Sequence, residues 1–405
     1  MGLIVIIIVL SIVVSYQLMG PMYEPNIVVS AKPIDAYTLF TLDLLKRMDF
    51  GKKNNIVSPL SIYIALLMLT EGSSGDTKEE LFNALHIASL NDSRTWFNNL
   101  LRDISNVKEP AKTSIANSIW VQKEFPINND YISILKKYYS AESRLINFQE
   151  NPFSAAKAIN EWVKNKTYGL IKKIIDPGSI DESTRIVLVN TIYFYSEWSK
   201  PFKKIVPGEF YSSRGTLDID YMKGVIDIHL LDTFEYLAIA IGYEGTDIKF
   251  VVIMPKDGDL EKFTNNLSKD KLLKIFNDLL SSEEVSVELY LPRFEIDSGI
   301  ISFKSILQDM GIKKVFIPGI ADLSFMVKDG DKILYIKDVF HRARIKVDLK
   351  GTEAAAATAI IAVLSAVIEH PKTIKINKPF MFFLVEPDNN AILFAGSIVD
   401  PSDLE

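Results

Sequence analysis

The sequence predicts a single mixed α+β domain spanning residues 25–405. Helical patterns dominate the first half of the chain, whereas segments rich in β-branched and aromatic residues dominate the second half. No stretch rich in Pro, Gly or Ser divides the chain. The chain has 405 residues, of which 48% are hydrophobic, so it can bury a large core without covalent cross-links.

The first 24 residues indicate targeting rather than fold. A run of 12 almost wholly apolar residues spans positions 3–14, and no charged residue occurs before Glu24. This length suits the core of a signal peptide better than a membrane span of about 20 residues. No Lys or Arg precedes the run and no A-x-A cleavage site follows it, so an uncleaved membrane anchor and a buried N-terminal strand remain alternatives. We expect a protein that is secreted or tethered to the outer face of the cell membrane.

Three segments of the first half carry start signals or apolar spacing typical of helices. The first follows a Ser-Pro dipeptide and is apolar nearly all round, which predicts a buried helix. The second follows a capping-box pattern, and the third has apolar residues at helical spacing. Helices are therefore expected over residues 60–70, after Thr77 and Glu80, and over 151–173, ending near Gly169.

Strands are expected where the apolar pattern changes its period to two or becomes continuous and β-branched. These segments alternate or are apolar throughout, as half-buried and fully buried strands are. They cover residues 185–194, 248–255, 285–296, 345–348, 381–386 and 392–399.

Composition excludes several classes of function. Lys and Arg total 45 against 51 Asp and Glu, and this net charge of −6 argues against a nucleic-acid binder. The absence of cysteine excludes thiol nucleophiles, thiolate metal sites and disulfides. The four histidines form no pair with metal-ligand spacing, and no nucleophile elbow, Walker loop or HExxH motif occurs. We therefore expect no enzyme, no metal and no cofactor.

One segment does not fit its surroundings. Residues 351–368 read GTEAAAATAIIAVLSAVI, which local propensity favours as a helix. A buried helix or half a membrane span would explain its lack of charge. The segment nevertheless lies between two strand-like segments, and with a period of two one face carries only small or apolar residues and Thr. Such a segment can be a loop in one state and a central strand in another.

A series of motifs follows in order along the chain. They are NNIVSPLSIYIAL (54–66), EGSSGDTKEEL (71–81), ANSIWVQ (116–122), INEWVKNKTYGLI (159–171), LVNTIYFYSEW (188–198), LPRFEI (291–296), ADLSFM (321–326), KGTEAAAATA (350–359), NKPFMFFL (377–384) and ILFAGSI (392–398). In sequence, order and spacing these motifs resemble the serpin family, from about residue 33 to 402.

The resemblance implies a fold with three β-sheets, eight or nine helices and an exposed reactive-centre loop at about 351–371. It also implies roles for single residues. The hinge, where the loop begins to enter the main sheet, would comprise Gly351, Thr352, Glu353, Ala354, Ala355, Ala356 and Ala357. The region where the strands part to admit the loop would contain Ser58, Ser61, Asn190, Trp198 and His341.

The small residues at 354–357 match inhibitory members, so the resemblance implies a suicide-substrate inhibitor. A serine protease would form an acyl-enzyme with the loop, and insertion of the cut loop as a new strand would trap this covalent complex. The partner is thus a serine protease and the inhibitor a monomer, although loop–sheet polymers are possible. The runner-up is a non-inhibitory serpin acting as a binding, storage or chaperone protein.

Counting from Gly351 in the usual inhibitory spacing puts the reactive bond at Ser365–Ala366, with Leu364 as the alternative. No Arg or Lys lies between Gly351 and Pro371, which argues against trypsin-like targets. An elastase-like, subtilisin-like or chymotrypsin-like enzyme fits better.

Two positions depart from the family pattern. Leu349 stands where most members carry Glu, with Asp348 beside it, and we expect this to loosen the hinge contact. Tyr195-Ser196 replaces the usual Lys-Gly pair before the tryptophan. Neither departure removes the small-residue hinge.

Overall fold

The computed structural model describes residues 29–328, 334–352 and 371–404, and these residues pack nine α-helices against three β-sheets. This arrangement confirms the expected fold class. The helices are α2 Pro33–Arg47, α3 Pro59–Glu71, α4 Gly75–Ala84, α5 Leu90–Ser105, α6 Asn129–Tyr139, α7 Pro152–Lys166, α8 Leu260–Asn265, α9 Lys269–Leu280 and α10 Lys304–Asp309.

The six-stranded sheet contains the first residues of the predicted hinge. Its order is β10 (Phe294–Asp297), β13 (Arg344–Asp348), β14 (Gly351–Thr352), β4 (Ile186–Glu197), β2 (Lys112–Gln122) and β3 (Glu142–Ile146). The two-residue strand β14 is antiparallel to both of its neighbours, β13 and β4. Because β14 leads directly into residue 353, the sheet already contains the first two residues of the hinge.

The nine-stranded sheet lies beside it and builds most of the remaining core. Along its path the strands are β1 (Asn55–Val57), β17 (Ala391–Ile398), β16 (Phe380–Glu386), β8 (Lys249–Pro255), β7 (Tyr236–Gly242), β6 (Gly215–Asp232), β9 (Glu284–Pro292) and β15 (Thr373–Lys375), and β5 (Lys204–Ser212) pairs with β6. The third sheet joins β11 (Ile301–Ser302) to β12 (Phe340–His341).

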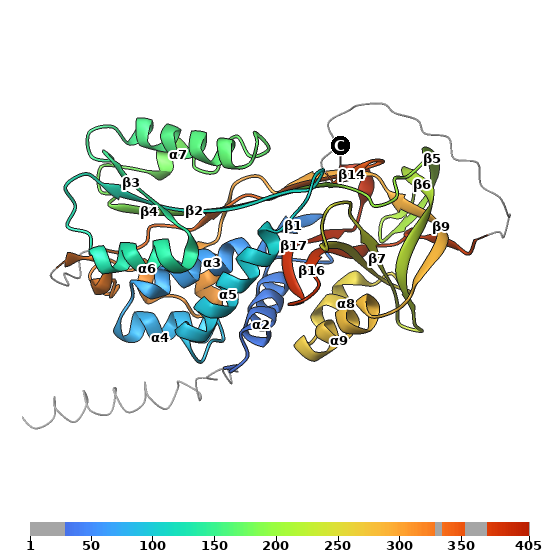
Figure 1. Cartoon of the computed structure of the whole chain (residues 1–405), viewed down its shortest axis with the longest axis horizontal. Helices are drawn as coiled ribbons and strands as arrows, with labels where there is room; N and C mark the ends of the chain where they lie inside the picture. The colour runs from blue at the N-terminus through green and yellow to red at the C-terminus, as the bar shows by residue number, and fades with distance from the viewer. Residues whose placement is uncertain (1–28, 329–333, 353–370, 405) are drawn as a thin grey trace, which may run out of the picture.

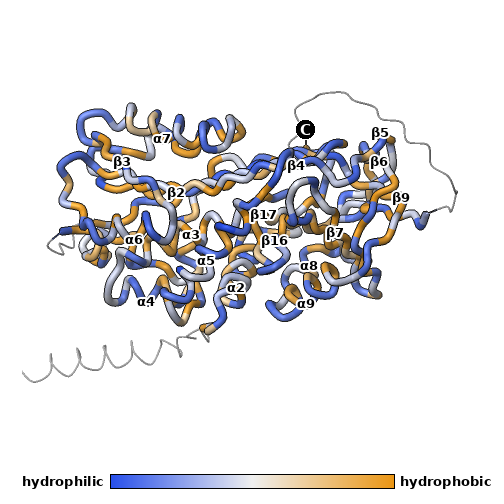
Figure 2. The backbone as a smooth tube through the Cα atoms, in the orientation of Figure 1, coloured by the Kyte–Doolittle hydropathy of each residue, from blue (hydrophilic) through white to orange (hydrophobic). Residues whose placement is uncertain are grey.

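Helices cover the two faces of the six-stranded sheet unequally. Figure 1 shows α7 alone over one face of β2, β3 and β4, with α3, α5 and α6 beneath the other. Trp162 of α7 meets Trp120 of β2 edge-on, with ring centroids 6.3 Å apart, inside a separate small core. The all-apolar pattern of α3 reflects its burial: Leu60, Ile64 and Leu67 are fully enclosed, and Figure 2 shows hydrophobic residues along this helix.

Several local predictions are confirmed. Ser58 caps α3 by accepting a hydrogen bond from the Ser61 amide. The helix expected over 151–173 begins at Pro152, is capped by Asn151, and ends at Lys166. Gly169 follows with a φ of +88°, a conformation that favours glycine after a helix.

Two local predictions are wrong. The Thr77–Glu80 capping box lies inside a helix, because α4 begins at Gly75. The Thr77 hydroxyl accepts instead from the Asp322 amide, and Glu80 accepts from the amides at 313 and 314. The single strand expected over 285–296 is two strands, β9 and β10, which break at Arg293 and belong to different sheets.

Candidate functional site: the strand-insertion site

Gly351 is enclosed where β14 enters the sheet. A Cβ atom added here would lie 2.1 Å from the Ser196 carbonyl oxygen and 2.6 Å from the Glu197 Cα. Backbone atoms cannot yield as the end of a long side chain can, so only glycine fits. The hinge position predicted for Gly351 is therefore a place of close backbone approach.

Thr352 is also buried, with 2% of its surface exposed. Its hydroxyl forms a hydrogen bond with the hydroxyl of Tyr243, a residue that follows β7 of the other sheet. The Tyr243 ring stacks on Trp198, with centroids 4.7 Å apart and planes 11° from parallel. Burial raises the pKa of Tyr243, which keeps its hydroxyl protonated as a neutral hydrogen-bonding group.

Trp198, directly after β4, forms hydrogen bonds with the residues that precede the hinge. Its indole Nε1 donates to the Asp348 carbonyl at 2.9 Å, and its backbone amide donates to the Lys350 carbonyl at 2.7 Å. These two bonds join Trp198 to the residues directly before β14.

The Leu349 departure leaves an ion pair in place at this end of the sheet. Leu349 packs against the main core, while Arg293 Nε lies 3.3 Å from Asp348 Oδ1. A charged contact between β13 and the β9–β10 junction is thus present without the usual Glu. At the second departure, Ser196 is fully buried and its hydroxyl donates to the Glu244 carbonyl at 2.7 Å.

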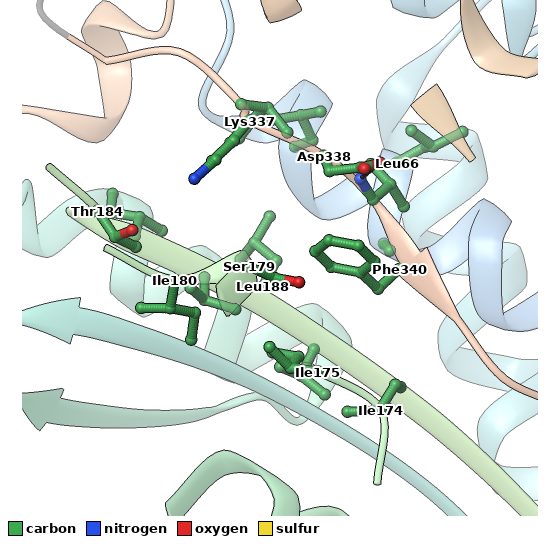
Figure 3. A pocket seen from close by; sticks show the side chains of 17 residues that line it. Leu66, Ile174, Ile175, Ser179, Ile180, Thr184, Leu188, Lys337, Asp338 and Phe340 are labelled. Atoms are coloured by element: carbon green, nitrogen blue, oxygen red, sulfur yellow. Dashed lines mark hydrogen bonds between the residues drawn. The ribbon is translucent and has the colours of Figure 1, made fainter. Parts of the chain in front are cut away.

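Below β14 the six-stranded sheet is open. Strand β4 pairs with β2 from Ile186 to Tyr195, but on its other edge the described residues pair with it only at Ser196 and Glu197. A cavity of about 90 Å³ lies between β4, α3 and residues 336–340. Figure 3 shows Phe340, Lys337 and Asp338 facing Leu188 across this cavity. This cavity borders β4 at residues 186–189, towards the end of the strand opposite to the residues that pair with β14.

Ser58, Ser61 and His341 meet at the start of α3. The Ser58 hydroxyl donates to the Leu393 carbonyl at 2.6 Å, and the Ser58 amide donates to His341 Nε2 at 3.1 Å. His341 therefore accepts at Nε2, which requires a neutral ring. Burial lowers the pKa of His341 to about 3, so the ring stays neutral at physiological pH.

Asn190 has a different set of contacts from this cluster. Its Nδ2 donates to the Asn117 side chain, which in turn donates to the Tyr139 carbonyl at 2.6 Å. Within the described part of the chain, the buried Oδ1 of Asn190 has no hydrogen-bond partner. The structure therefore groups the predicted residues into two sets, at the start of α3 and around β14, and places Asn190 in neither.

Some predicted residues lie outside the described part of the chain. These are the segment 1–24, Glu353, Ala354, Ala355, Ala356 and Ala357 of the hinge, and Leu364, Ser365 and Ala366 at the reactive bond.

Sequence reasoning missed Tyr243. Tyr243 directly follows the apolar strand β7, and its partner Thr352 lies 109 positions further along the chain. The fold brings the two together, and nothing in the local sequence signals the contact.

Two further findings concern the described residues alone. They contain no cluster of three or more His, Asp or Glu side chains placed to hold a metal ion. None of the helices drawn from them combines the length and the apolar character that a membrane span requires.

Comparison with known proteins agrees with this geometry. The family model for serpins, described as serine protease inhibitors, matches residues 35–401. An uncharacterized serpin-like protein of Thermococcus kodakarensis is 34% identical over 379 residues, covering 92% of this chain and 87% of that protein. The leukocyte elastase inhibitor of Equus caballus is 30% identical, covering 90% and 98%.

A solved structure agrees as well. The native state of the thermophilic serpin tengpin superposes with a TM-score of 0.78 at 27% identity, covering 94% of this chain and 97% of that one. The chain described here belongs to the serpin family, whose members are in general protease inhibitors.

Proposed function

We propose that this chain is a suicide-substrate inhibitor of serine proteases. The observation that carries the proposal is the two-residue strand β14, which pairs with the end of a β4 edge that has no other strand partner among the described residues. A strand that continued β14 would find the β4 edge from Ile186 to Tyr195 available for pairing. Completing the sheet would therefore release the free energy that traps the protease.

The proposed sequence of steps begins at the loop. The protease serine Oγ attacks the carbonyl carbon of Ser365, and the amide nitrogen of Ala366 leaves as an amine after taking up a proton. An ester then joins protease and inhibitor. The freed segment from residue 353 onward inserts beside β4 and carries the protease with it before water can hydrolyse the ester. A dozen new hydrogen bonds at about 1 kcal/mol each would supply on the order of ten kcal/mol.

The loop sequence supports a target that is not trypsin-like. Ser365 and Ala366 suit an elastase-like or subtilisin-like protease, and the alternative Leu364 suits a chymotrypsin-like one. The apolar run at 3–14 supports export, and we propose that the inhibitor acts as a monomer outside the cell or on the outer face of its membrane.

The test is to mix the protein with elastase, subtilisin, chymotrypsin and trypsin and to examine the products on denaturing gels. We expect a stable covalent complex with at least one of the first three and none with trypsin. Mass spectrometry of the released C-terminal peptide then identifies the bond. Cleaved protein alongside fully active protease would contradict inhibition and favour the binding, storage or chaperone alternative.

Thr352→Arg provides the matched control. Thr352 is 2% exposed, and a cation cannot enter that position without losing its hydration. Residue 352 should then be unable to lie in β14, so the cut loop has no strand to extend. The variant should be cut at the same bond and release active protease.

A further inference from the structure

The hydroxyl groups of Tyr243 and Thr352 join the two large sheets at the head of the opening. Tyr243 follows β7 in the nine-stranded sheet, and Thr352 is the last residue of β14 in the six-stranded sheet. Both residues are buried, at 4% and 2% exposure. Among the described residues, the hydrogen-bond partner of each hydroxyl is the other hydroxyl. Withdrawal of the hinge would thus leave the Tyr243 hydroxyl unpaired in an apolar setting, which is unfavourable.

The tyrosine is held rigidly on its own side. Its ring stacks on Trp198 and meets Phe194 edge-on, with centroids 5.0 Å apart in the second pair. The following residue, Glu244, donates its amide to the Glu197 carbonyl at 2.8 Å. The Tyr243 hydroxyl is therefore held in place relative to β4 by contacts that do not involve Thr352.

Strand β14 depends on such support because it is only two residues long. Ordering the backbone of each residue has an entropic cost similar in size to the net gain from one hydrogen bond. One side-chain hydrogen bond therefore has a large effect on the fraction of molecules in which β14 is formed.

We propose that Tyr243 is a positioning residue that holds Thr352 in the sheet and so sets the register from which the cut loop inserts. The proposal rests on the inhibitory function proposed above. Insertion then extends an existing strand, which shortens the time during which water can hydrolyse the acyl-enzyme. Without the hydroxyl, more molecules are released as cleaved inhibitor.

The test compares Tyr243→Phe, Thr352→Val and the double variant with the wild type in two measurements. Hydrogen–deuterium exchange of the free protein reports the formation of β14 through the amides of Gly351 and Thr352. The stoichiometry of inhibition reports the competition between insertion and hydrolysis. We expect each single variant to exchange about fivefold faster, in line with the loss of one hydrogen bond. The inhibitor consumed per protease should rise severalfold.

The double variant should exchange no faster, and consume no more inhibitor per protease, than either single variant, because both substitutions remove the same bond. Two further variants make the result specific. Thr352→Ser retains a hydroxyl and should restore the amide protection. Tyr131→Phe is the matched control, because it deletes another buried hydroxyl, which donates to the Met68 carbonyl at 3.1 Å.

The two measurements separate the two proposals. Unchanged amide exchange in Tyr243→Phe would overturn the positioning role, as would faster exchange with unchanged stoichiometry. A wild type that traps no protease would overturn the inhibitory function and with it the role in insertion. In that case the exchange data would still decide whether the hydrogen bond holds β14.

Discussion

At the scale of single residues, the buried histidine is the most informative. His341 has 4% of its surface exposed, and its Nε2 accepts from the Ser58 amide. Since Ser58 also caps α3 and binds the Leu393 carbonyl, a single pair of residues links a helix, β12 and β17. A proton on His341 would remove the acceptor on which this link depends.

This leads to a pH prediction for stability. The pKa of His341 lies at about 3 in the folded protein, below the ordinary histidine value of 6.5. The unfolded chain therefore binds an extra proton between these values, so stability is complete above pH 6.5 and falls as the pH drops. Relative to His341→Gln, the wild type should lose about 1.4 kcal/mol of unfolding free energy between pH 7.5 and 5.5.

Urea unfolding at the two pH values measures the difference. The carboxylates titrate alike in both proteins, so their contribution cancels. Equal losses in wild type and variant would show that His341 does not titrate in this way.

At the scale of elements, β14 is the strand on which the proposed function depends. Its first residue has no room for a side chain, because the Ser196 carbonyl oxygen and the Glu197 Cα lie in the way. Gly351→Ala should therefore expel β14 and destabilise the protein by about 1–3 kcal/mol, the usual cost of overpacking. Fast amide exchange at Thr352, together with a lower free energy of unfolding in urea, would show both effects.

Gly178→Ala is the control for this change. No atom lies within 4 Å of the Cβ that it would add, so it should leave both measurements near the wild-type values. If the two variants behaved alike, the close approach at Gly351 would not restrict the residue.

The elements also show what sequence can predict. Periodicity located α3, α7, β4, β8 and β17, because each buries a continuous apolar face that leaves a local pattern. The capping-box pattern failed at Thr77, because the Thr77 hydroxyl accepts from the distant Asp322 amide and makes no local capping contact. Likewise, alternation cannot reveal that the chain changes sheets at Arg293, since both strands keep the same period.

The candidate site divides in the same way. Gly351, Thr352, Trp198, Ser58 and His341 were identified through resemblance, and the structure places them at the ends of the opening or beside it. Asn190 was identified in the same way, but it binds Asn117 and lies apart from both groups. Tyr243 was not identified, because its contact with Thr352 spans 109 positions and leaves no local signal.

At the scale of the whole molecule, the proposed mechanism requires that the uncut protein be held short of its most hydrogen-bonded state. From Ile186 to Tyr195, one edge of β4 has no strand partner among the described residues, and neither has the inner edge of β13 below Val347. The sequence has no cysteine, so packing and hydrogen bonds hold this state. In the proposed mechanism, cutting the loop frees the strand that completes the sheet.

Cleavage should therefore stabilise the molecule. Thermolysin is a suitable reagent, because a metalloprotease forms no acyl-enzyme and leaves a free cleaved product. About ten kcal/mol from a dozen new hydrogen bonds, at about 2 °C per kcal/mol for a large domain, predicts that the Tm rises by roughly 20 °C. Thermal melts followed by circular dichroism, before and after the cut, measure this shift.

Thr352→Arg distinguishes insertion from simple release of strain in the loop. Its loop should be cut as readily, but a cation at the buried position 352 should prevent the new strand from forming. The cut variant should then melt close to its uncut form. An equal rise in both proteins, or no rise in the wild type, would mean that the opening beside β4 does not receive the loop, and the proposed mechanism would lose its source of energy.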